Sequence, residues 1–255
     1  MLSDIFVYLA IFVTILGSVS LLLLWANSSL KRTLSFVDIL IKKDKESLND
    51  QKRKEYLKKL AQYEYPRMLL VLKRVIDIFI SAVALLLFLP NFLLVSLAIK
   101  IESHGPIFVK KRRMGLDGTL FLKYAFRTTR FDSKGNTELI FANITKVGAF
   151  LRKLSLDELP SLLNILFGDM SIVGRSLIME DSFADKMLSP EEKAVLLKVK
   201  PGMVSLWSIS PDWFDRNFER IVEFDLFYAA NWSLWLDFQI VVRTIPATLG
   251  IWAKY

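Results

Sequence analysis

Two adjacent carboxylates, Asp157 and Glu158, are the residues best suited to chemistry in this sequence. The chain has no cysteine and a single histidine, His104, which excludes thiolate nucleophiles, disulfides and multi-histidine metal sites. An ionised carboxylate can attack phosphorus or bind a divalent cation, and a second carboxylate beside it can hold the cation or transfer a proton. The residue types therefore favour a hard cation such as Mg²⁺ and an anionic substrate.

The segment Ser155-Leu-Asp-Glu-Leu-Pro160 that carries this pair has two compatible interpretations. Ser155 followed three residues later by Glu158 is typical of a capping box, a common structural feature at the start of a helix. An Asp in the first helical turn lies near the positive end of the helix dipole, so we expect Asp157 to be ionised and available for chemistry. Arg152, one turn upstream, is either a surface charge or a group that neutralises phosphate oxygens.

The composition indicates a protein attached to a membrane. Of its 255 residues, 53% are apolar and 24% are charged, and the formal net charge is +8. An ordinary soluble domain is about 45–50% apolar, so this chain is more apolar than a purely soluble protein. It carries too many charges for a polytopic transporter. Membrane segments joined to one or two soluble parts satisfy both observations.

The elements that position the pair begin with an uncharged apolar block over residues 5–26. About 20 helical residues cross the hydrocarbon core of a bilayer, so we predict an N-terminal transmembrane helix within residues 1–30. A Lys-rich stretch follows, and the positive-inside rule places it in the cytoplasm. We predict a basic cytoplasmic linker helix over residues 31–70, either solvated near anionic headgroups or bound to a partner.

The second apolar block, residues 75–99, has basic residues on both flanks, with Asp77 near its start and Pro90 in its second half. A helix crossing the bilayer would leave one basic flank outside, against the charge bias. Proline removes a backbone hydrogen bond and bends a helix. We therefore predict a re-entrant membrane helix over residues 71–100, broken at Pro90, that leaves on the side it entered. An ordinary spanning helix is the alternative.

The remainder, residues 101–255, is expected to form a cytosolic α+β domain. Short β-prone runs on either side of Gly115 and Asp117-Gly118 predict a hairpin. Further helices are predicted over residues 147–154, 155–167, 218–228 and 234–245, and from Ser189-Pro190 onward. The chain as a whole is predicted to be membrane-associated and mostly α-helical, with a small β-hairpin.

A series of motifs in a fixed order occupies the chain from about Lys73 to Thr244. The motifs are Lys73-Arg-Val-Ile-Asp77, Gly105-Pro-Ile-Phe108, Arg113-Met-Gly115, Phe126-Arg127-Thr128, Thr145-Lys-Val-Gly-Ala-Phe-Leu-Arg152, Ser155-Leu-Asp157-Glu158-Leu-Pro160, Asn164-Ile-Leu-Phe-Gly-Asp-Met-Ser171, Lys200-Pro-Gly202, Asp225-Leu-Phe-Tyr228 and Trp232-Ser-Leu-Trp-Leu-Asp237. In these motifs the chain resembles the bacterial sugar transferases, monotopic polyprenyl-phosphate phosphoglycosyl transferases that begin cell-envelope glycan synthesis.

The resemblance implies a catalytic role for the acidic pair. Asp157 and Glu158 match the family's catalytic dyad, in which the Asp attacks the phosphate of a nucleoside-diphosphate sugar and releases a nucleoside monophosphate. The sugar phosphate held on the enzyme then passes to undecaprenyl phosphate, with Mg²⁺ at Asp157. The implied phosphate-binding residues are Arg113, Arg127, Arg152 and Arg175.

The resemblance also implies a cellular location and a set of partners. A re-entrant helix bent at Pro90 seats the family's catalytic domain on the cytoplasmic face of the bacterial inner membrane. The implied partners are the nucleoside-diphosphate sugar, undecaprenyl phosphate and membrane lipid. Homo- and hetero-oligomers are both compatible with it, and no nucleic acid is expected. The product would initiate exopolysaccharide or glycoconjugate synthesis.

Several positions depart from the family pattern. The family usually has Gln where this chain has Lys111, Lys where it has Ala125, and Val-Gly-Pro-Arg-Pro where it has Val173-Gly-Arg-Ser-Leu177. Arg175 and Lys123 could replace the missing cations, although Lys123 is expected to face the opposite side of its strand. Two hypotheses stay open. One is an enzyme with altered donor specificity; the other is a catalytically weak relative acting as a partner subunit in a polysaccharide assembly complex.

Overall fold

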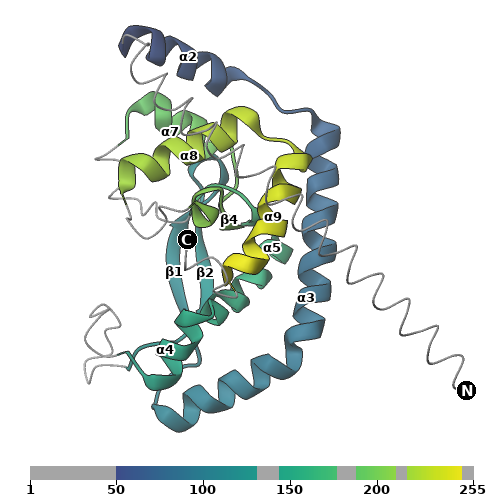
Figure 1. Cartoon of the computed structure of the whole chain (residues 1–255), viewed down its shortest axis with the longest axis vertical. Helices are drawn as coiled ribbons and strands as arrows, with labels where there is room; N and C mark the ends of the chain where they lie inside the picture. The colour runs from purple at the N-terminus through teal and green to yellow at the C-terminus, as the bar shows by residue number, and fades with distance from the viewer. Residues whose placement is uncertain (1–49, 131–143, 177–187, 211–216, 249–255) are drawn as a thin grey trace, which may run out of the picture.

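The computed structural model describes residues 50–130, 144–176, 188–210 and 217–248, and within these residues the protein is mostly helical with two small sheets (Figure 1). The predicted N-terminal transmembrane helix lies outside the described residues. Helix α2 (Asp50–Gln62) falls within the predicted linker helix, and its Leu57 is buried in a core of the soluble domain. That helix is therefore docked on the domain along one side.

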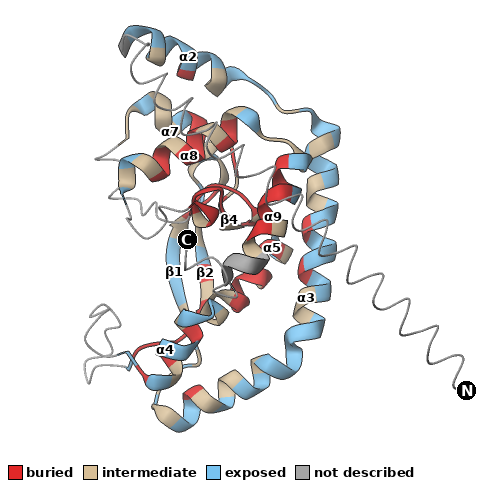
Figure 2. Ribbon diagram, in the orientation of Figure 1, coloured by how far each residue is buried: buried red, intermediate tan, exposed pale blue. Residues whose placement is uncertain are grey.

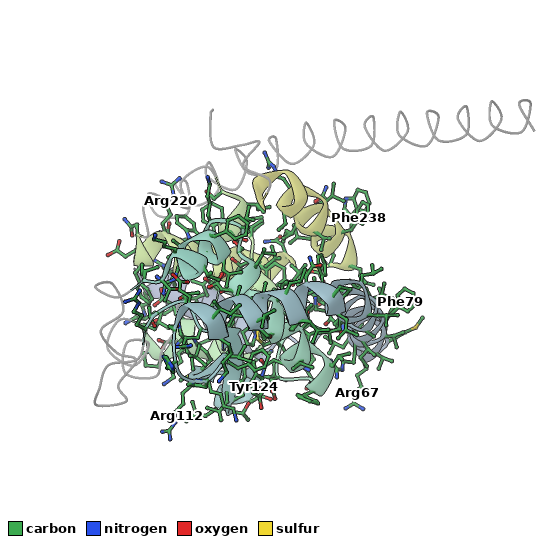
Figure 3. The ribbon with its side chains drawn as sticks, turned by 90° about the horizontal axis from the view of Figure 1, so that it is seen from below. Arg67, Phe79, Arg112, Tyr124, Arg220 and Phe238 are labelled. Carbon is green, nitrogen blue, oxygen red and sulfur yellow. The ribbon has the colours of Figure 1, made fainter. Side chains whose placement is uncertain are left out.

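Helix α3 (Arg67–Glu102) is the one helix in the described part of the chain that is long and apolar enough to cross a membrane. Most of its surface is exposed, as the pale-blue ribbon in Figure 2 shows, and Phe79 projects away from the protein in Figure 3. The helix runs along one side of the molecule and then bends under it toward α4 (Lys146–Lys153) in Figure 1. It continues through Pro90 as one bent helix, where the sequence predicted a break.

The predicted hairpin is confirmed. Strands β1 (Phe108–Met114) and β2 (Leu120–Phe126) pair in antiparallel register, with Lys111 directly opposite Lys123. The turn between them contains Asp117 at φ 53°, a left-handed conformation that Asp adopts more readily than most residues. Because directly opposite residues share a face of the sheet, this register decides which hairpin side chains reach the acidic pair.

The remaining elements form the body of the soluble domain. They are the 3₁₀ turn η2 (Leu156–Ser161), α5 (Leu162–Phe167), β3 (Ser171–Val173), α7 (Pro190–Leu197), β4 (Gly202–Val204), the short turn η3 (Trp207–Ile209), α8 (Phe218–Asn231) and α9 (Leu234–Thr248). Strands β3 and β4 pair in parallel. The helix predicted from Ser189-Pro190 is confirmed as α7, with a reciprocal capping box between Ser189 and Glu192.

Two clusters of buried apolar side chains stabilise the domain. One lies among α7, α8 and α9 and includes Phe224 and Ile240. The other joins α3, β2, α4 and α5 and includes Phe126 and Ile165. Leu159, the residue after the acidic pair, is buried in the second cluster, which therefore supports the segment carrying the two carboxylates.

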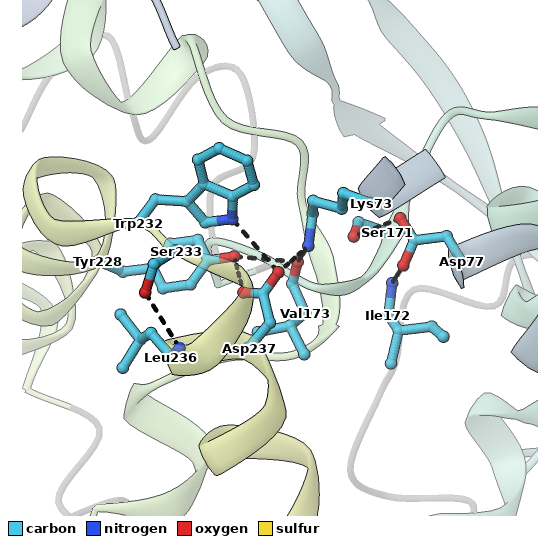
Figure 4. A network of polar contacts seen from close by, with 10 residues as sticks. All are labelled: Lys73, Asp77, Ser171, Ile172, Val173, Tyr228, Trp232, Ser233, Leu236 and Asp237. Atoms are coloured by element: carbon cyan, nitrogen blue, oxygen red, sulfur yellow. Dashed lines mark hydrogen bonds and ion pairs between the residues drawn. The ribbon is translucent and has the colours of Figure 1, made fainter. Parts of the chain in front are cut away.

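The N-terminal half of α3 is fixed to the soluble domain by a polar network (Figure 4). The Lys73 ammonium donates to the Asp237 carboxylate at 2.5 Å and to the Val173 carbonyl at 3.0 Å. The same carboxylate accepts hydrogen bonds from the Tyr228 hydroxyl at 2.6 Å and the Trp232 indole at 3.2 Å. We call Lys73, Asp237, Tyr228 and Trp232 the α3–α9 network, because it joins the apolar helix to the end of α8 and the start of α9.

Two neighbours of Lys73 on α3 extend this attachment. Asp77 accepts hydrogen bonds from the Ser171 hydroxyl at 2.7 Å and the Ile172 backbone N–H at 3.1 Å. Arg74 donates to two carbonyls near the end of α5, where a cation is favoured by the helix dipole. Since α5 directly follows the segment that carries the acidic pair, the apolar helix is docked on the element next to the candidate site.

The C-terminal end of α3 is attached to the same domain. The Glu102 carboxylate accepts the backbone N–H groups of Lys146 at 2.6 Å and Val147 at 2.8 Å, which satisfies the first turn of α4. Arg127, which follows β2, donates to two backbone carbonyls just after α3. Both ends of the apolar helix therefore contact one domain.

Candidate active site

The acidic pair lies in η2, between α4 and α5, and both of its residues are half-buried. The predicted capping box is wrong, because Ser155 has a left-handed backbone (φ 54°) and its side chain makes no cap. The Glu158 carboxylate instead accepts a hydrogen bond from the Lys123 ammonium at 2.8 Å. Contact with the hairpin, rather than helix capping, therefore positions the pair.

Lys123 reaches Glu158 from the inner face of β2 and has 7% of its side chain exposed. The expectation that this side chain faces away was wrong. Lys123 and Ala125 are two residues apart on one strand, so they share a face, and both are buried. The Glu158 side chain is 40% exposed, so only the Lys123 ammonium would be left buried without a charge partner if this ion pair were broken.

Asn164, on α5, fixes the strand that carries Lys123. Its side-chain amide accepts from the Tyr124 backbone N–H at 2.9 Å and donates to the Leu122 carbonyl at 2.8 Å. These two groups flank Lys123 along the chain, and Asn164 is fully buried. One amide side chain thus takes the place of a neighbouring strand at the edge of β2 and sets the position of Lys123 over the pair.

Arg152 comes to the pair from α4. Its Nε donates to the Thr128 hydroxyl at 2.9 Å, and its charge acts on both Asp157 and Lys111. Helix α4 lies so near the chain after β2 that a Cβ on Gly148 would come within 2.1 Å of the Thr128 carbonyl oxygen. Glycine at this position therefore permits the approach that brings Arg152 to the carboxylates.

Strand β1 adds two cations on the same face of the hairpin. Lys111 is directly opposite Lys123, and Arg113 lies two residues further along β1. Partial burial, and then the charges of neighbouring cations, lower the pKa of Lys111. We call Lys111, Arg113, Lys123 and Arg152 the cationic cluster. In the sequence, Lys111 was noted only as a departure from the family pattern. The turn at Asp117-Gly118 sets the register of the hairpin, so it was the signal that could have placed Lys111 at the site.

Desolvation raises the pKa of Asp157, and the neighbouring charge of Glu158 raises it further. Arg152 and Lys123 act in the opposite direction without reversing the shift. The shift is opposite in direction to the predicted effect of a helix dipole, because desolvation is its largest cause and Asp157 lies in the 3₁₀ segment η2 and not in the first turn of an α-helix. A carboxylate with a raised pKa is more basic than one in water, which favours attack on an electrophile once it is ionised.

Two of the four arginines predicted to bind phosphate have structural roles instead. Arg127 is 1% exposed and donates to the carbonyls of Ser103 and His104. Arg175 is 1% exposed and donates to backbone carbonyls after α7 and at the end of β1, and burial lowers its pKa to about 10. Buried guanidiniums that bind backbone carbonyls are not available to a substrate. Arg152 lies near Asp157, and Arg113 lies on the hairpin face of Lys111, so phosphate binding by these two stays a prediction, whereas burial contradicts it for Arg127 and Arg175.

A magnesium ion, which the sequence predicts at Asp157, would find few protein ligands here. In the part of the chain that the structure describes, no three or more His, Asp or Glu side chains gather as a metal site. Mg²⁺ commonly takes one or two carboxylates and completes its shell with water and substrate phosphates. Asp157, next to the cationic cluster, fits that mode of binding and does not fit an all-protein cage.

Comparison with known proteins agrees with the motifs. A profile of the bacterial sugar transferase family matches residues 68–250. The exopolysaccharide production protein ExoY of Rhizobium meliloti is 39% identical over 194 residues, covering 69% of this chain and 84% of ExoY. The UDP-glucose:undecaprenyl-phosphate glucose-1-phosphate transferase of Caulobacter vibrioides is 36% identical over 189 residues, covering 69% of each chain. Its namesake in Klebsiella pneumoniae is 35% identical over 187 residues, covering 69% of this chain and 40% of its own length. The chain therefore belongs to the bacterial sugar transferase family.

Proposed function

We propose that this protein transfers a sugar-1-phosphate from a nucleoside-diphosphate sugar, of the UDP-sugar class, to undecaprenyl phosphate. The observation that carries the proposal is the placement of Asp157 and Glu158 among the cationic cluster, which suits a carboxylate reacting with phosphates. Relatives named as UDP-glucose:undecaprenyl-phosphate glucose-1-phosphate transferases support the substrate classes. The name of ExoY supports a role in exopolysaccharide production.

In the first step, a carboxylate oxygen of Asp157 attacks the phosphorus that bears the sugar. The bond from that phosphorus to the oxygen of the nucleotide phosphate breaks, and the nucleoside monophosphate leaves with the electron pair. An aspartyl-phosphosugar remains on the protein. The cationic cluster reduces the repulsion between the attacking carboxylate and the donor phosphates and stabilises the charge on the leaving group.

In the second step, a phosphate oxygen of undecaprenyl phosphate attacks the same phosphorus, and the bond to Asp157 breaks to restore the carboxylate. Glu158, held by Lys123, is placed beside Asp157 to accept the proton of a singly protonated acceptor phosphate. Mg²⁺ held by Asp157 and the substrate phosphates would supply further positive charge at the transferred group.

Purified protein with undecaprenyl phosphate, Mg²⁺ and a panel of UDP-sugars is expected to release UMP with at least one donor. EDTA is expected to reduce release to background, and excess Mg²⁺ to restore it, because the metal neutralises phosphate charge. Reactions without the lipid acceptor are the control and should stop near one UMP per protein molecule. Absence of release across the panel contradicts the proposal and favours the catalytically weak partner subunit.

We also infer that α3 enters the membrane and returns on the cytoplasmic side, with the catalytic domain on that face. Contacts of Asp77 near one end and Glu102 at the other with the same soluble domain support this inference. A straight helix between those residues would extend about 37 Å, more than the hydrocarbon thickness of about 30 Å. A spanning helix would therefore place Asp77 and Glu102 on opposite sides of the membrane, although both contact the same domain. The bend of α3 in Figure 1 allows both ends to lie on one side.

Topology can be tested with single cysteines, since the natural chain has none. Arg67→Cys and Lys100→Cys place thiols at exposed positions near the two ends of α3, and Lys59→Cys marks the soluble side on α2. We expect a membrane-impermeant maleimide to label all three in inside-out vesicles and none in intact spheroplasts. Labelling of Arg67→Cys and Lys100→Cys from opposite sides would establish a spanning helix instead.

A further inference from the structure

We propose that Lys111 binds a phosphate group of the nucleotide-sugar donor and sets the affinity for that donor. This inference rests on the proposed function and adds a residue to it. Lys111 lies directly opposite Lys123 on the hairpin and near enough to Asp157 for their charges to interact.

The register places Lys111 on the same face as the acidic pair. Lys111 pairs directly with Lys123, and directly opposite residues have Cβ atoms about 4.5–5.5 Å apart on one face of an antiparallel pair. The Lys123 ammonium lies 2.8 Å from a Glu158 oxygen, so the face that carries both lysines looks toward the two carboxylates. The next residue, Lys110, is on the other face, with its ammonium 5.4 Å from the centre of the Tyr124 ring.

The members of the cationic cluster differ in the hydrogen bonds and ion pairs that they already make within the protein. Lys123 is nearly buried and bound to Glu158, and Arg152 donates to Thr128. Lys111 is exposed and makes no hydrogen bond or ion pair with the residues that the structure describes. Arg113 donates to the Arg112 carbonyl at 3.1 Å. Among the described residues of the cluster, the Lys111 ammonium is therefore the one that can turn to a ligand without breaking a hydrogen bond or ion pair.

The charge balance favours a ligand with about two negative charges. Like charges directly opposite each other on a hairpin are destabilising. Lys111, Lys123 and Arg152 bind or act on the two carboxylates, and Arg113 acts on Lys111, so the four cations of the cluster exceed the two carboxylates by two charges. Mg²⁺ at Asp157 would add to this excess. The diphosphate of a UDP-sugar carries two negative charges on two phosphate groups, whereas a lipid monophosphate carries about 1.5–2 negative charges on one group at pH 7. Only the donor therefore offers a second phosphate to Lys111 while its first phosphate lies at Asp157.

Kinetics with both substrates tests the assignment. Lys111→Gln keeps a polar side chain and removes the charge, so we expect the KM for the UDP-sugar to rise roughly tenfold, with a smaller fall in kcat from the lost stabilisation of the leaving group. The KM for undecaprenyl phosphate should not change, and Lys111→Arg should retain most of the affinity. The matched control is Lys110→Gln, which removes a charge from the adjacent position on the opposite face and should leave both KM values unchanged.

A rise in the KM for the lipid acceptor alone would overturn the donor assignment, as would unchanged kinetics in Lys111→Gln. Calorimetric binding of UDP with Mg²⁺ provides a readout that does not need turnover, and Lys111→Gln is expected to bind roughly tenfold more weakly. Weaker UDP binding in a protein that releases no UMP would support the Lys111 site while contradicting the proposed reaction. Equal UDP binding by both proteins, or no UDP binding by the wild type, would overturn the Lys111 site.

Discussion

Asp157→Asn is expected to reduce UMP release by about 10⁴-fold or more, because an amide of the same shape cannot act as the nucleophile. Glu158→Gln is expected to reduce it by about 10²–10³-fold, since a proton acceptor and the partner of Lys123 are lost while the nucleophile remains. Both effects are measured as UMP released at saturating donor and acceptor. The difference between the two variants separates the role of Asp157 as nucleophile from the role of Glu158 as proton acceptor.

The covalent intermediate gives a direct check. Wild-type protein mixed with donor and Mg²⁺, without the lipid acceptor, should gain the mass of one sugar phosphate on the peptide that contains Asp157. Asp157→Asn should gain none. UMP release that survives in Asp157→Asn, or an adduct on another residue, would show that Asp157 is not the nucleophile.

The same variant is expected to keep or gain stability, which separates a catalytic role from a structural one. Desolvation and the charge of Glu158 raise the pKa of Asp157 in the folded protein. Between the unfolded and folded pKa values the native state binds more protons, so stability falls as the pH rises through that interval. The amide introduced by Asp157→Asn cannot ionise, so at neutral pH the variant does not lose the stability that the wild type loses when Asp157 ionises. The Tm of Asp157→Asn should therefore equal or exceed that of the wild type, and a fall in Tm together with activity would indicate a structural residue.

The features that sequence predicted well are those set by local signals. The turn at Asp117-Gly118 between two β-prone runs predicted the hairpin, and Ser189-Pro190 predicted the start of α7. Gly168 ends α5 with a positive φ of 98°, as glycine after a helix commonly does. In each case the conformation depends on a few neighbouring residues, so no knowledge of the rest of the fold is required.

The errors concern side chains whose role depends on distant parts of the chain. Ser155 and Glu158 have the spacing of a capping box, but Glu158 is bound by Lys123, which is 35 positions away. Arg127 and Arg175 look like phosphate ligands in the sequence and are buried against backbone carbonyls in the structure. Some cations of the site therefore lie at positions that no motif predicts. The main example is Lys111, which is placed there by its register with Lys123.

Asp237→Leu is expected to lower the free energy of unfolding by about 3–5 kcal/mol, because it leaves the ammonium of Lys73 buried without its charge partner. The two side chains are each 12% exposed, and the carboxylate also accepts from Tyr228 and Trp232 (Figure 4). The Tm measured in detergent or nanodiscs should fall by about 10 °C. The exposed pair of Lys59 and Glu55, with side chains 75% and 67% exposed, is the control. Glu55→Gln should change stability by less than about 0.5 kcal/mol.

The double variant Lys73→Met/Asp237→Leu separates the attraction within the pair from the cost of stranding one charge. Burial raises the pKa of Asp237 although Lys73 opposes the shift, so desolvation outweighs the attraction between the two groups. An apolar pair of similar size should therefore recover much of the Tm lost by Asp237→Leu. Arg74 binds the end of α5 next to this pair, so recovery of the Tm should come with restored docking of α3. Transfer of the sugar phosphate to the lipid acceptor, measured as UMP release, should then return as well. A Tm for Asp237→Leu no lower than that of Glu55→Gln would show that the α3–α9 network does not hold the apolar helix in place.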